Sequence, residues 1–277
     1  MNQITVIKPR DRLSLRNIYD SFSEVIKYWE LLYFFIWKNV KVRYKRTFVG
    51  IGWAVVQPFM TMVVFTIFFG KLAKLPSYDL PYPIFYYSGL LCWGYFSSSV
   101  QNATASIISN RGIITKVYIP RMIFPISAVL SGLVDFVIAF GMFLVLMVIY
   151  GIPFGIHFAF FPAFVLLNIF AALSLGIWLS ALNTLYRDVQ YLVPFLIQIL
   201  LFASPVVYPA SMVPESLRFF YGLNPMVGVV EGFRWSLTGA GQPSGVHLFS
   251  SLITMFFIFI GGLVYFKKVE TKIADVV

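Results

Sequence analysis

Charge is scarce in this chain of 277 residues, because Asp, Glu, Lys and Arg together make up only 12% of it. Soluble domains carry about twice that share. Cysteine is rarer still: Cys92 is the single one, which excludes an intrachain disulfide and a zinc site built on paired cysteines. The two histidines, His157 and His247, have no cysteine or carboxylate cluster nearby, so we expect surface histidines and no metal site.

The motifs of several enzyme classes are missing as well. The chain has no phosphate loop of the form G-x-x-x-x-G-K-[ST], so we do not expect it to bind and hydrolyse ATP itself, and any ATP energy must come from a partner. No G-x-S-x-G or H-E-x-x-H pattern supports a hydrolase or a metalloprotease. A polar catalytic cluster, which a membrane-embedded transferase would need, is also missing. Without internal repeats, a secondary transporter built from inverted copies is disfavoured.

Apolar residues, by contrast, make up 59% of the chain and gather in long runs. A helix that crosses the hydrocarbon core of a bilayer needs about 20 mostly apolar residues. The runs are continuous and do not alternate with polar residues as barrel strands do. We therefore predict an all-α integral membrane protein with residues 1–48 as a cytoplasmic N-terminus, residues 49–277 as the transmembrane domain, and six transmembrane helices. These six are residues 49–70, 83–100 with a polar extension to Asn110, 123–150, 158–182, 191–207 and 248–266.

Lys and Arg are distributed unevenly between the expected loops. With both termini inside, 17 of the 21 lie on the inner side and only Lys71, Lys74, Arg218 and Arg234 on the outer side. Positive loops are retained in the cytoplasm. We therefore predict cytoplasmic termini, and we interpret the net charge of +10 as a signal of orientation and anionic lipid, not of nucleic acid.

The segment ahead of the first apolar run is amphipathic. Ser21 and Glu24 have the spacing of a capping box, so we expect the regular helix to begin near Ser21. Because the segment is aromatic and too charged to cross, we predict a helix in the inner-leaflet interface; a soluble helix packed on a partner is the alternative. Its apolar residues recur at spacings of three and four: Leu15, Ile18, Phe22, Val25, Trp29, Leu32 and Ile36.

Residues 208–246, between the last two runs, hold apolar pieces that are too short to cross. We predict outer re-entrant gate helices here, because irregular backbone at membrane depth must be buried in protein or face a wet cavity. A simple surface loop is the alternative. Glu231 and Arg234 are three residues apart and would pair on one helix face, either as a gate latch or as an ordinary ion pair. The candidate gate residues are Tyr208, Asn224, Pro225, Glu231 and Arg234.

Three further features of the predicted spans invite a functional interpretation. Asp135 is an acid at membrane depth and has no obvious basic partner there, which leaves a proton relay, a substrate contact or a bond between helices. Tyr86, Trp93 and Phe96 are candidate channel aromatics on which sugars would stack, with an interfacial aromatic belt as the alternative. Small residues at positions 172, 176 and 180 predict close helix packing.

The inner loop 110–121 is short and basic, and Pro120 can end one helix or begin the next. A short cytoplasmic helix in this loop would transmit force from a partner, whereas without a partner the loop is a plain connection.

Short motifs occur along almost the whole chain, and their order and spacing together are specific. They are 42–53 (VRYKRTFVGIGW), 57–58 (QP), 88–93 (SGLLCW), Asn110 with 116–121 (KVYIPR), 186–189 (YRDV), 204–209 (SPVVYP), 223–226 (LNPM) and 231–234 (EGFR). In these motifs the chain resembles the ABC-2 family of exporter permeases, in particular the polysaccharide branch that exports O-antigen, capsule and teichoic-acid glycans. Cys92 stands where that family commonly has proline. The resemblance implies a location in the bacterial inner membrane, with ATP and Mg bound by a partner subunit.

The resemblance implies a homodimeric permease for a lipid-linked glycan, most fittingly O-antigen, with two cytoplasmic ATP-binding subunits that hydrolyse ATP. It implies that the amphipathic helix and the inner loop dock on those subunits, that residues 212–239 form the outer gate, and that the dimer interface holds the channel. A drug or small-lipid exporter, a membrane-embedded transferase and a secondary transporter are the alternatives. The residues expected to couple the chain to the ATPase subunit are Asn110, Lys116, Tyr118, Pro120 and Arg121.

Overall fold

The computed structural model describes residues 23–45 and 50–276, and within these residues all regular structure is helical. This confirms the all-α part of the predicted fold class. The elements in chain order are α2 (Trp29–Tyr44), η1 (Gly50–Gly52), α3 (Trp53–Phe65), the π-helix η2 (Thr66–Leu72), α4 (Tyr82–Ser109), α5 (Arg111–Ile114), α6 (Ile123–Ile149), η3 (Ile156–Phe160), α7 (Phe161–Leu185), α8 (Val189–Phe202), η4 (Ala210–Met212), η5 (Glu215–Leu217), α9 (Arg218–Gly222), α10 (Pro225–Thr238) and α11 (Gly245–Val276).

Four helical segments of the described chain are long and apolar enough to cross a membrane: Trp53–Leu72, Ile123–Ile149, Ile156–Leu185 and Gly245–Glu270. They correspond to four of the six predicted spans. α4 has 28 residues, but its second half is rich in serine, asparagine and glutamine. α8 has only 14 residues and ends at Phe202, five residues before the predicted end, because the chain turns at Ser204-Pro205.

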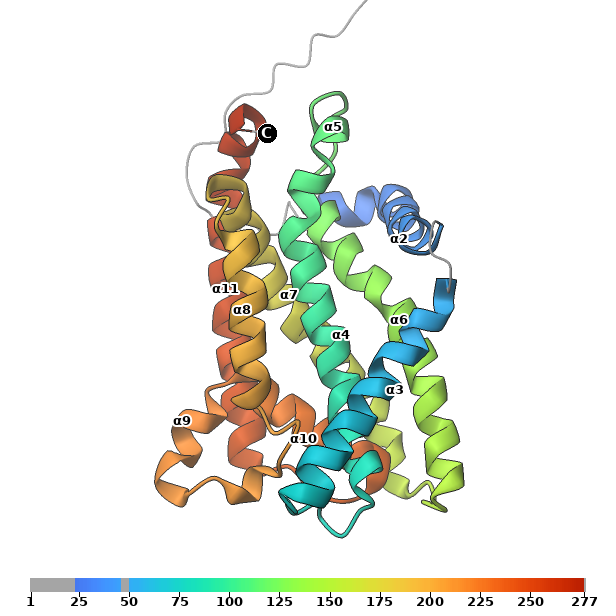
Figure 1. Cartoon of the computed structure of the whole chain (residues 1–277). Coiled ribbons are helices and arrows are strands. Elements are labelled where there is room, and N and C mark those ends of the chain that lie inside the picture. The colour runs from blue at the N-terminus through green and yellow to red at the C-terminus, as the bar shows by residue number, and fades with distance from the viewer. Residues whose placement is uncertain (1–22, 46–49, 277) are drawn as a thin grey trace, which may run out of the picture.

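α4 lies at the centre of the bundle and packs against α3, α6, α7, α8 and α10 (Figure 1). Its contact with α7 is close, as the small residues predicted. A Cβ atom added to Gly176 would lie 2.8 Å from the Cβ of Ala103, so the two backbones approach too closely for a larger side chain at position 176.

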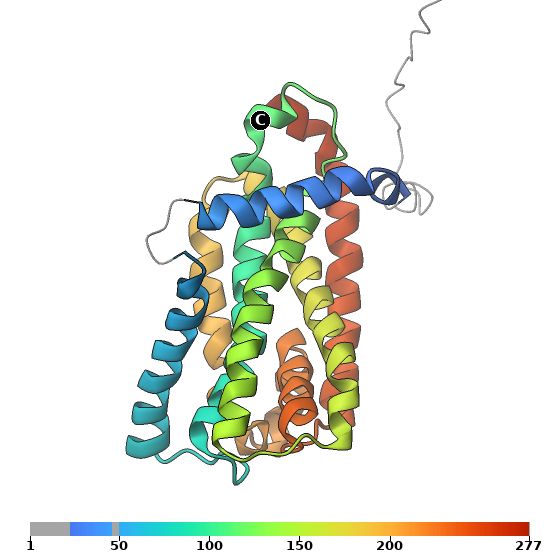
Figure 2. The same cartoon turned by 90° about the vertical axis from the view of Figure 1, so that its right-hand side faces the viewer.

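α2 lies across one end of the bundle, roughly at right angles to the long helices (Figure 2). It packs on α6 through Phe35 and Phe124, whose ring centroids are 5.0 Å apart. The helix continues to Tyr44, eight residues beyond the last member of the predicted apolar series, while Leu15, Ile18, Ser21 and Phe22 lie outside the described residues. Several aromatic side chains of α2 stay exposed, among them Trp29, Tyr33 and Trp37. A helix with one face on the protein and an exposed aromatic face fits the predicted membrane interface.

The short helices α9 and α10 lie at the opposite end of the bundle, between α8 and α11 in the sequence (Figure 1). α10 begins with Asn224, whose side chain accepts a hydrogen bond from the Met226 amide, followed by Pro225 at the first helical position. It ends at Gly239, which has a φ of 74°. The end that carries α2 also carries the C-terminal end of α11 (Figure 1).

Candidate functional site

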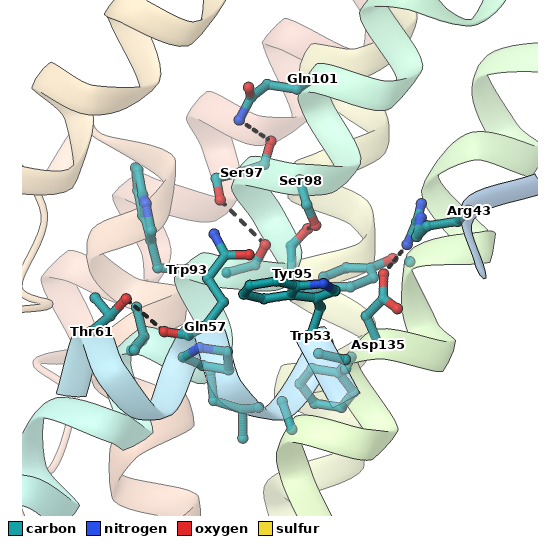
Figure 3. A pocket seen from close by; sticks show the side chains of 18 of the residues that line it. Arg43, Trp53, Gln57, Thr61, Trp93, Tyr95, Ser97, Ser98, Gln101 and Asp135 are labelled. Atoms are coloured by element: carbon teal, nitrogen blue, oxygen red, sulfur yellow. Dashed lines mark hydrogen bonds and ion pairs between the residues drawn. The ribbon is translucent and has the colours of Figure 1, made fainter. Parts of the chain in front are cut away.

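A cavity of about 590 Å³ opens between α3, α4 and α6 beside the end of α2 (Figure 3). Its volume lies within the range of about 300–1,000 Å³ that is usual for small-molecule sites. The wall combines aromatic rings with neutral polar groups and a single pair of opposite charges. The labelled side chains in Figure 3 are Arg43, Trp53, Gln57, Thr61, Trp93, Tyr95, Ser97, Ser98, Gln101 and Asp135.

The serine and glutamine side chains of α4 are oriented by its own backbone. Ser97 and Ser98 donate to the carbonyl oxygens of Gly94 and Tyr95, each at 3.2 Å, and the Gln101 amide donates to the carbonyl of Ser97 at 3.2 Å. A hydroxyl that donates once still has acceptor lone pairs. The α4 wall therefore presents neutral acceptors beside Trp93, a combination that suits polyhydroxylated ligands.

The predicted channel aromatics do not all reach this cavity. Trp93 lines it. Tyr86 and Phe96 are fully buried inside the chain: Tyr86 stacks on Phe65 at a centroid distance of 4.7 Å, and Phe96 packs on Trp93 at 5.4 Å. The sequence did not single out Trp53 or Gln57 as site residues, although both belong to the motifs 42–53 and 57–58.

Asp135 has a basic partner after all, and the expectation that it lacks one was wrong. Its carboxylate forms an ion pair with Arg43 and accepts a hydrogen bond from the Tyr44 hydroxyl (Figure 3 draws the ion pair). The side chains of Arg43 and Asp135 are each 28% exposed. Both partners come from the end of α2, which is about 90 positions earlier in the sequence and outside the predicted spans. Burial lowers the pKa of Arg43 from its ordinary value, yet a guanidinium stays charged in proteins.

The inner loop is anchored at both ends. The buried side chain of Asn110 accepts a hydrogen bond from the Lys38 ammonium of α2 and donates to the carbonyl of Ser106 at 2.7 Å. Arg121 donates to the carbonyl of Glu270 in α11 at 2.6 Å. Burial lowers the pKa of Lys38 from its ordinary value.

Between these anchors lie the short helix α5 and an exposed stretch. Lys116 is exposed, Tyr118 is 72% exposed, and Pro120 is buried. The middle of the loop is thus open to a partner, while Asn110, Pro120 and Arg121 fix its position on the bundle.

At the other end, Arg234 of α10 is almost completely buried, with 1% of its surface exposed. Its Nε donates to the carbonyl of Phe85 at 3.3 Å, and its Nη2 donates to those of Pro205 at 2.7 Å and Val206 at 3.1 Å. The guanidinium carbon also lies 3.9 Å from the ring centroid of Phe85. Arg234 therefore ties α10 to the start of α4 and to the chain that follows α8.

Glu231 does not pair with Arg234, contrary to the expectation from their spacing. Its carboxylate lies 2.9 Å from Nδ1 of His247 in α11, and both residues are 5% exposed. Burial raises the pKa of Glu231, and the hydrogen bond with His247 opposes that shift. His247 is thus a buried residue and not a surface histidine. His157 is half-buried beside Trp235, at a ring-centroid distance of 6.1 Å.

Three of the predicted gate residues converge on the backbone just after α8. The Tyr208 hydroxyl donates to the carbonyl of Phe202 at 2.9 Å, and the Asn224 amide donates to that of Ala203 at 2.9 Å. Arg234 donates to the buried carbonyls of Pro205 and Val206, as described above. The last carbonyls of a helix have no partner within the helix. These side chains supply partners there, so the chain leaves α8 in a fixed conformation.

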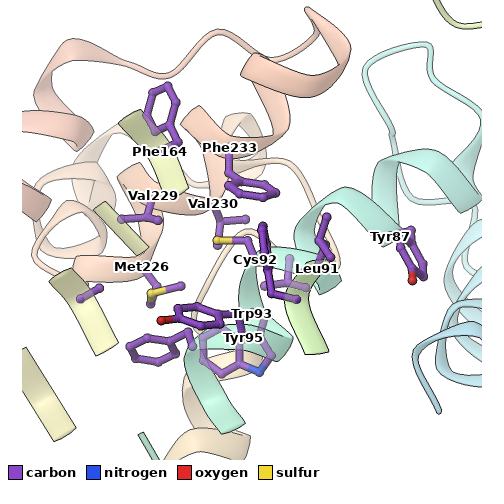
Figure 4. Packing of buried hydrophobic residues seen from close by; sticks show 14 of the residues in the cluster. Tyr87, Leu91, Cys92, Trp93, Tyr95, Phe164, Met226, Val229, Val230 and Phe233 are labelled. Atoms are coloured by element: carbon purple, nitrogen blue, oxygen red, sulfur yellow. The ribbon is translucent and has the colours of Figure 1, made fainter. Parts of the chain in front are cut away.

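The apolar residues around this region form one continuous cluster. Figure 4 shows Met226, Val229, Val230 and Phe233 of α10 directed toward Trp93 and Cys92 of α4. Cys92 is completely buried there. No group of three or more His, Cys, Asp or Glu side chains that could hold a metal ion occurs in the described part of the chain. The candidate site is the cavity, which Arg43 and Tyr44 of α2 border at one end.

Comparisons with known proteins agree with this architecture. A family model for ABC-2 type transporters matches residues 30–238, which run from α2 to the end of α10. The chain is 34% identical over 215 residues to the O-antigen export system permease protein RfbA of Myxococcus xanthus, covering 76% of this chain and 81% of that protein. It is 26% identical over 242 residues to RfbA of Klebsiella pneumoniae, covering 86% and 92%. It is also 24% identical over 245 residues to the polysialic acid transport protein KpsM of Escherichia coli, covering 86% and 93%. The chain therefore belongs to the ABC-2 type transporter family.

Proposed function

We propose that this chain is the membrane-embedded permease of an ATP-driven exporter that moves a lipid-linked polysaccharide, O-antigen in the first instance, across the bacterial inner membrane. The observation that carries the proposal is the likeness to the RfbA permeases over 76% of the chain or more. The cavity supports it independently, because aromatic rings beside neutral acceptors suit sugar rings better than small ions. The chain itself is not an enzyme in this proposal, since ATP and Mg are bound by a separate subunit.

The membrane topology we propose has six spans, with α4 and α8 added to the four long apolar helices. At about 1.5 Å per residue, the 28 residues of α4 extend about 42 Å, which exceeds the hydrocarbon core. α8 is shorter than α4. The segment that follows it, with the short helices α9 and α10, would fill the remaining thickness of the bilayer and form the outer re-entrant gate. Both termini then lie in the cytoplasm, on the side of α2 and the inner loop, and residues 49–277 form the transmembrane domain.

A homodimer is part of the proposal. α3 and α8 each leave a row of large apolar side chains exposed, as expected for faces covered by lipid or by a second copy of the chain. With two copies face to face, the cavity wall of α4 would border a shared channel. The exposed rows include Trp53 and Met60 on α3 with Phe68 on η2, which continues it, and Phe195, Ile199 and Phe202 on α8.

Two cytoplasmic ATP-binding subunits would dock on α2 and on the inner loop. Lys116 and Tyr118 are exposed and would make direct contact, whereas Asn110, Pro120 and Arg121 would hold the loop in place. ATP-driven closure of those subunits must favour one permease state over another for transport to occur.

The first test is ATPase activity of the chain purified together with its candidate ATP-binding partner, with and without lipid-linked glycan. We expect a stable complex whose ATPase activity responds to the glycan, and Tyr118→Ala or Lys116→Ala should weaken that response. Lys74→Ala, the same substitution at the opposite end of the molecule, is the matched control. A chain that purifies alone, with no associated ATPase, would refute the exporter function.

The orientation has its own test in a Cys92→Ala background. A cysteine at Lys74 should react with a membrane-impermeant thiol reagent in intact spheroplasts, whereas one at Tyr118 should react only after permeabilisation. The reverse pattern would place the termini outside.

A further inference from the structure

The end of α2 is attached to α6 by a row of contacts along one face. Phe35 packs on Phe124, the Asn39 amide lies 3.5 Å from the Ser127 hydroxyl, and Arg43 pairs with Asp135. Positions 35, 39 and 43 are four apart, so their side chains lie on one face of the helix. The row ends at the ion pair, which is also the part of the contact that borders the cavity.

Arg43 and Asp135 are the only charged residues among the described residues that line the cavity. Each side chain is 28% exposed, so water reaches the pair when it separates. Ion pairs that are open to water contribute about 0–1 kcal/mol and are easily broken, in contrast to fully buried pairs. The ion pair therefore fixes where α2 lies on α6, but separating its two charges requires little free energy.

The same helix also holds the inner loop. Lys38 binds the side chain of Asn110, which sits directly between the end of α4 and the short helix α5. One helix of 16 residues thus connects the loop at residue 110 with the cavity wall at residue 135. A displacement of the loop that pulls on Lys38 acts on Arg43, less than two helical turns further along.

The partners of Asp135 argue against its other possible roles. A proton relay needs groups that gain and lose protons, but the guanidinium of Arg43 stays protonated. A substrate would meet a carboxylate whose charge Arg43 already compensates, because its two oxygens accept from Arg43 and from Tyr44.

We propose that the contact of Arg43 and Tyr44 with Asp135 is a latch that holds α2 against α6 and closes the cavity on that side, and that movement of the loop 110–121 releases it. Asp135 acts as the positioning residue of this α2–α6 latch. The proposal rests on the proposed function in one respect, because the force that moves the loop comes from the ATP-binding partner. The closed contact and its link to the loop are properties of this chain.

The test measures access to the cavity. Ser98→Cys is introduced in the Cys92→Ala background, and its reaction rate with a water-soluble maleimide is followed on purified protein. Arg43→Ala and Asp135→Ala should each raise the reaction rate about fivefold. Losing a partly exposed ion pair shifts the equilibrium between the closed and the open cavity by about that factor. The swapped pair, Arg43→Asp with Asp135→Arg, should return the rate toward that of the parent. Lys41→Ala, an exposed cation two positions from Arg43, is the matched control.

A second measurement decides the matter if the single variants fold poorly. Cysteines at positions 43 and 135 are joined by a short reversible bifunctional thiol reagent. We expect the linked protein to lose glycan export and to regain it when a reductant cleaves the link. Rates at Ser98→Cys that are equal in all variants, or full export by the linked protein, would overturn the latch.

The outcomes separate the latch from the proposed function. If the parent protein exports no glycan, the exporter fails, yet the reaction rates at Ser98→Cys still decide whether the ion pair closes the cavity. If the parent exports glycan and the linked protein exports equally well, the exporter stands and the latch is refuted.

Discussion

At the α10 end of the molecule, Arg234 and the pair of Glu231 with His247 are almost completely buried, whereas at the α2 end the ion pair of Arg43 with Asp135 is partly exposed. Arg234 and the pair of Glu231 with His247 are 1–5% exposed, while the side chains of Arg43 and Asp135 are 28% exposed. Buried charges are strongly destabilising once a partner is lost, but exposed pairs are not. Charged and polar side chains hold both ends, but the loss of a partner should destabilise the α10 end more than the α2 end.

This difference indicates where the molecule can move. The α10 end fixes the backbone at the end of α8 with donors from three separate positions, and the hydrogen bonds of Arg234 among them are buried, so opening this end breaks several hydrogen bonds at once. At the α2 end, the charged contacts are the hydrogen bond of Lys38 with Asn110 and the ion pair of Arg43 with Asp135, which borders the cavity. We expect α2 and the inner loop to move first. α10 and the residues packed around it should move only when a large force or a substrate drives them.

Removing Arg234 should have the largest effect. Arg234→Ala leaves the buried carbonyls of Phe85, Pro205 and Val206 without their donor, which should lower the free energy of unfolding by about 3 kcal/mol or more. Thermal unfolding of the purified protein measures this. Arg218→Ala is the control, because Arg218 pairs with Glu215 at the surface. Equal losses for the two variants would contradict the distinction between buried and exposed arginine.

His247→Ala should rank second. It leaves the Glu231 carboxylate buried without its hydrogen-bond partner, at a cost of about 2 kcal/mol. Adding Glu231→Gln to that variant should recover part of the stability, because the amide carries no charge to desolvate. The same unfolding assay compares the single and the double variant. A double variant that is less stable than His247→Ala would mean that the carboxylate has another buried partner.

Gly232→Ala tests packing at the same end. The added Cβ would lie 1.9 Å from a ring carbon of Phe164, so the buried ring must shift, and overpacking of this kind costs about 1–3 kcal/mol. Gly141→Ala is the matched control, since a Cβ at Gly141 meets nothing within 4 Å and alanine is the better helix former. We expect the first to lower the unfolding temperature and the second to leave it unchanged or raise it.

The four long apolar helices could be predicted from the sequence, because a long run of apolar residues corresponds directly to a helix that crosses the bilayer. The early end of α8 was missed, since the run of apolar residues continues past Ser204-Pro205 while the helix does not. Proline disfavours helical backbone at the residue before it, but that local signal competed with a long apolar window. Boundaries set by a single proline are therefore the weakest part of such a prediction.

The site was harder to predict for a different reason. Asp135 looked unpaired because its partners lie on a helix outside the spans, and Glu231 was assigned the nearest cation in sequence when its partner is His247 in another helix. Local spacing reveals pairs within one helix only. The cavity residues Trp53 and Gln57 stood within recognised motifs, yet only the packing of α3 against α4 brings them beside Trp93.

The smallest expected effect concerns Lys38, at the looser end. Lys38→Met removes the hydrogen bond to the Asn110 side chain, but Asn110 still donates to the carbonyl of Ser106, so the loss of stability should be about 0.5–1 kcal/mol. The local effect should be clearer: hydrogen exchange should accelerate at the end of α4 and in α5, where the loop loses its tie to α2, while exchange in α10 stays slow. Lys41→Met, an exposed neighbour on the same helix, should change neither. Faster exchange in α10 as well would mean that the two ends open together, and the contrast between a fixed end and a movable end would not hold.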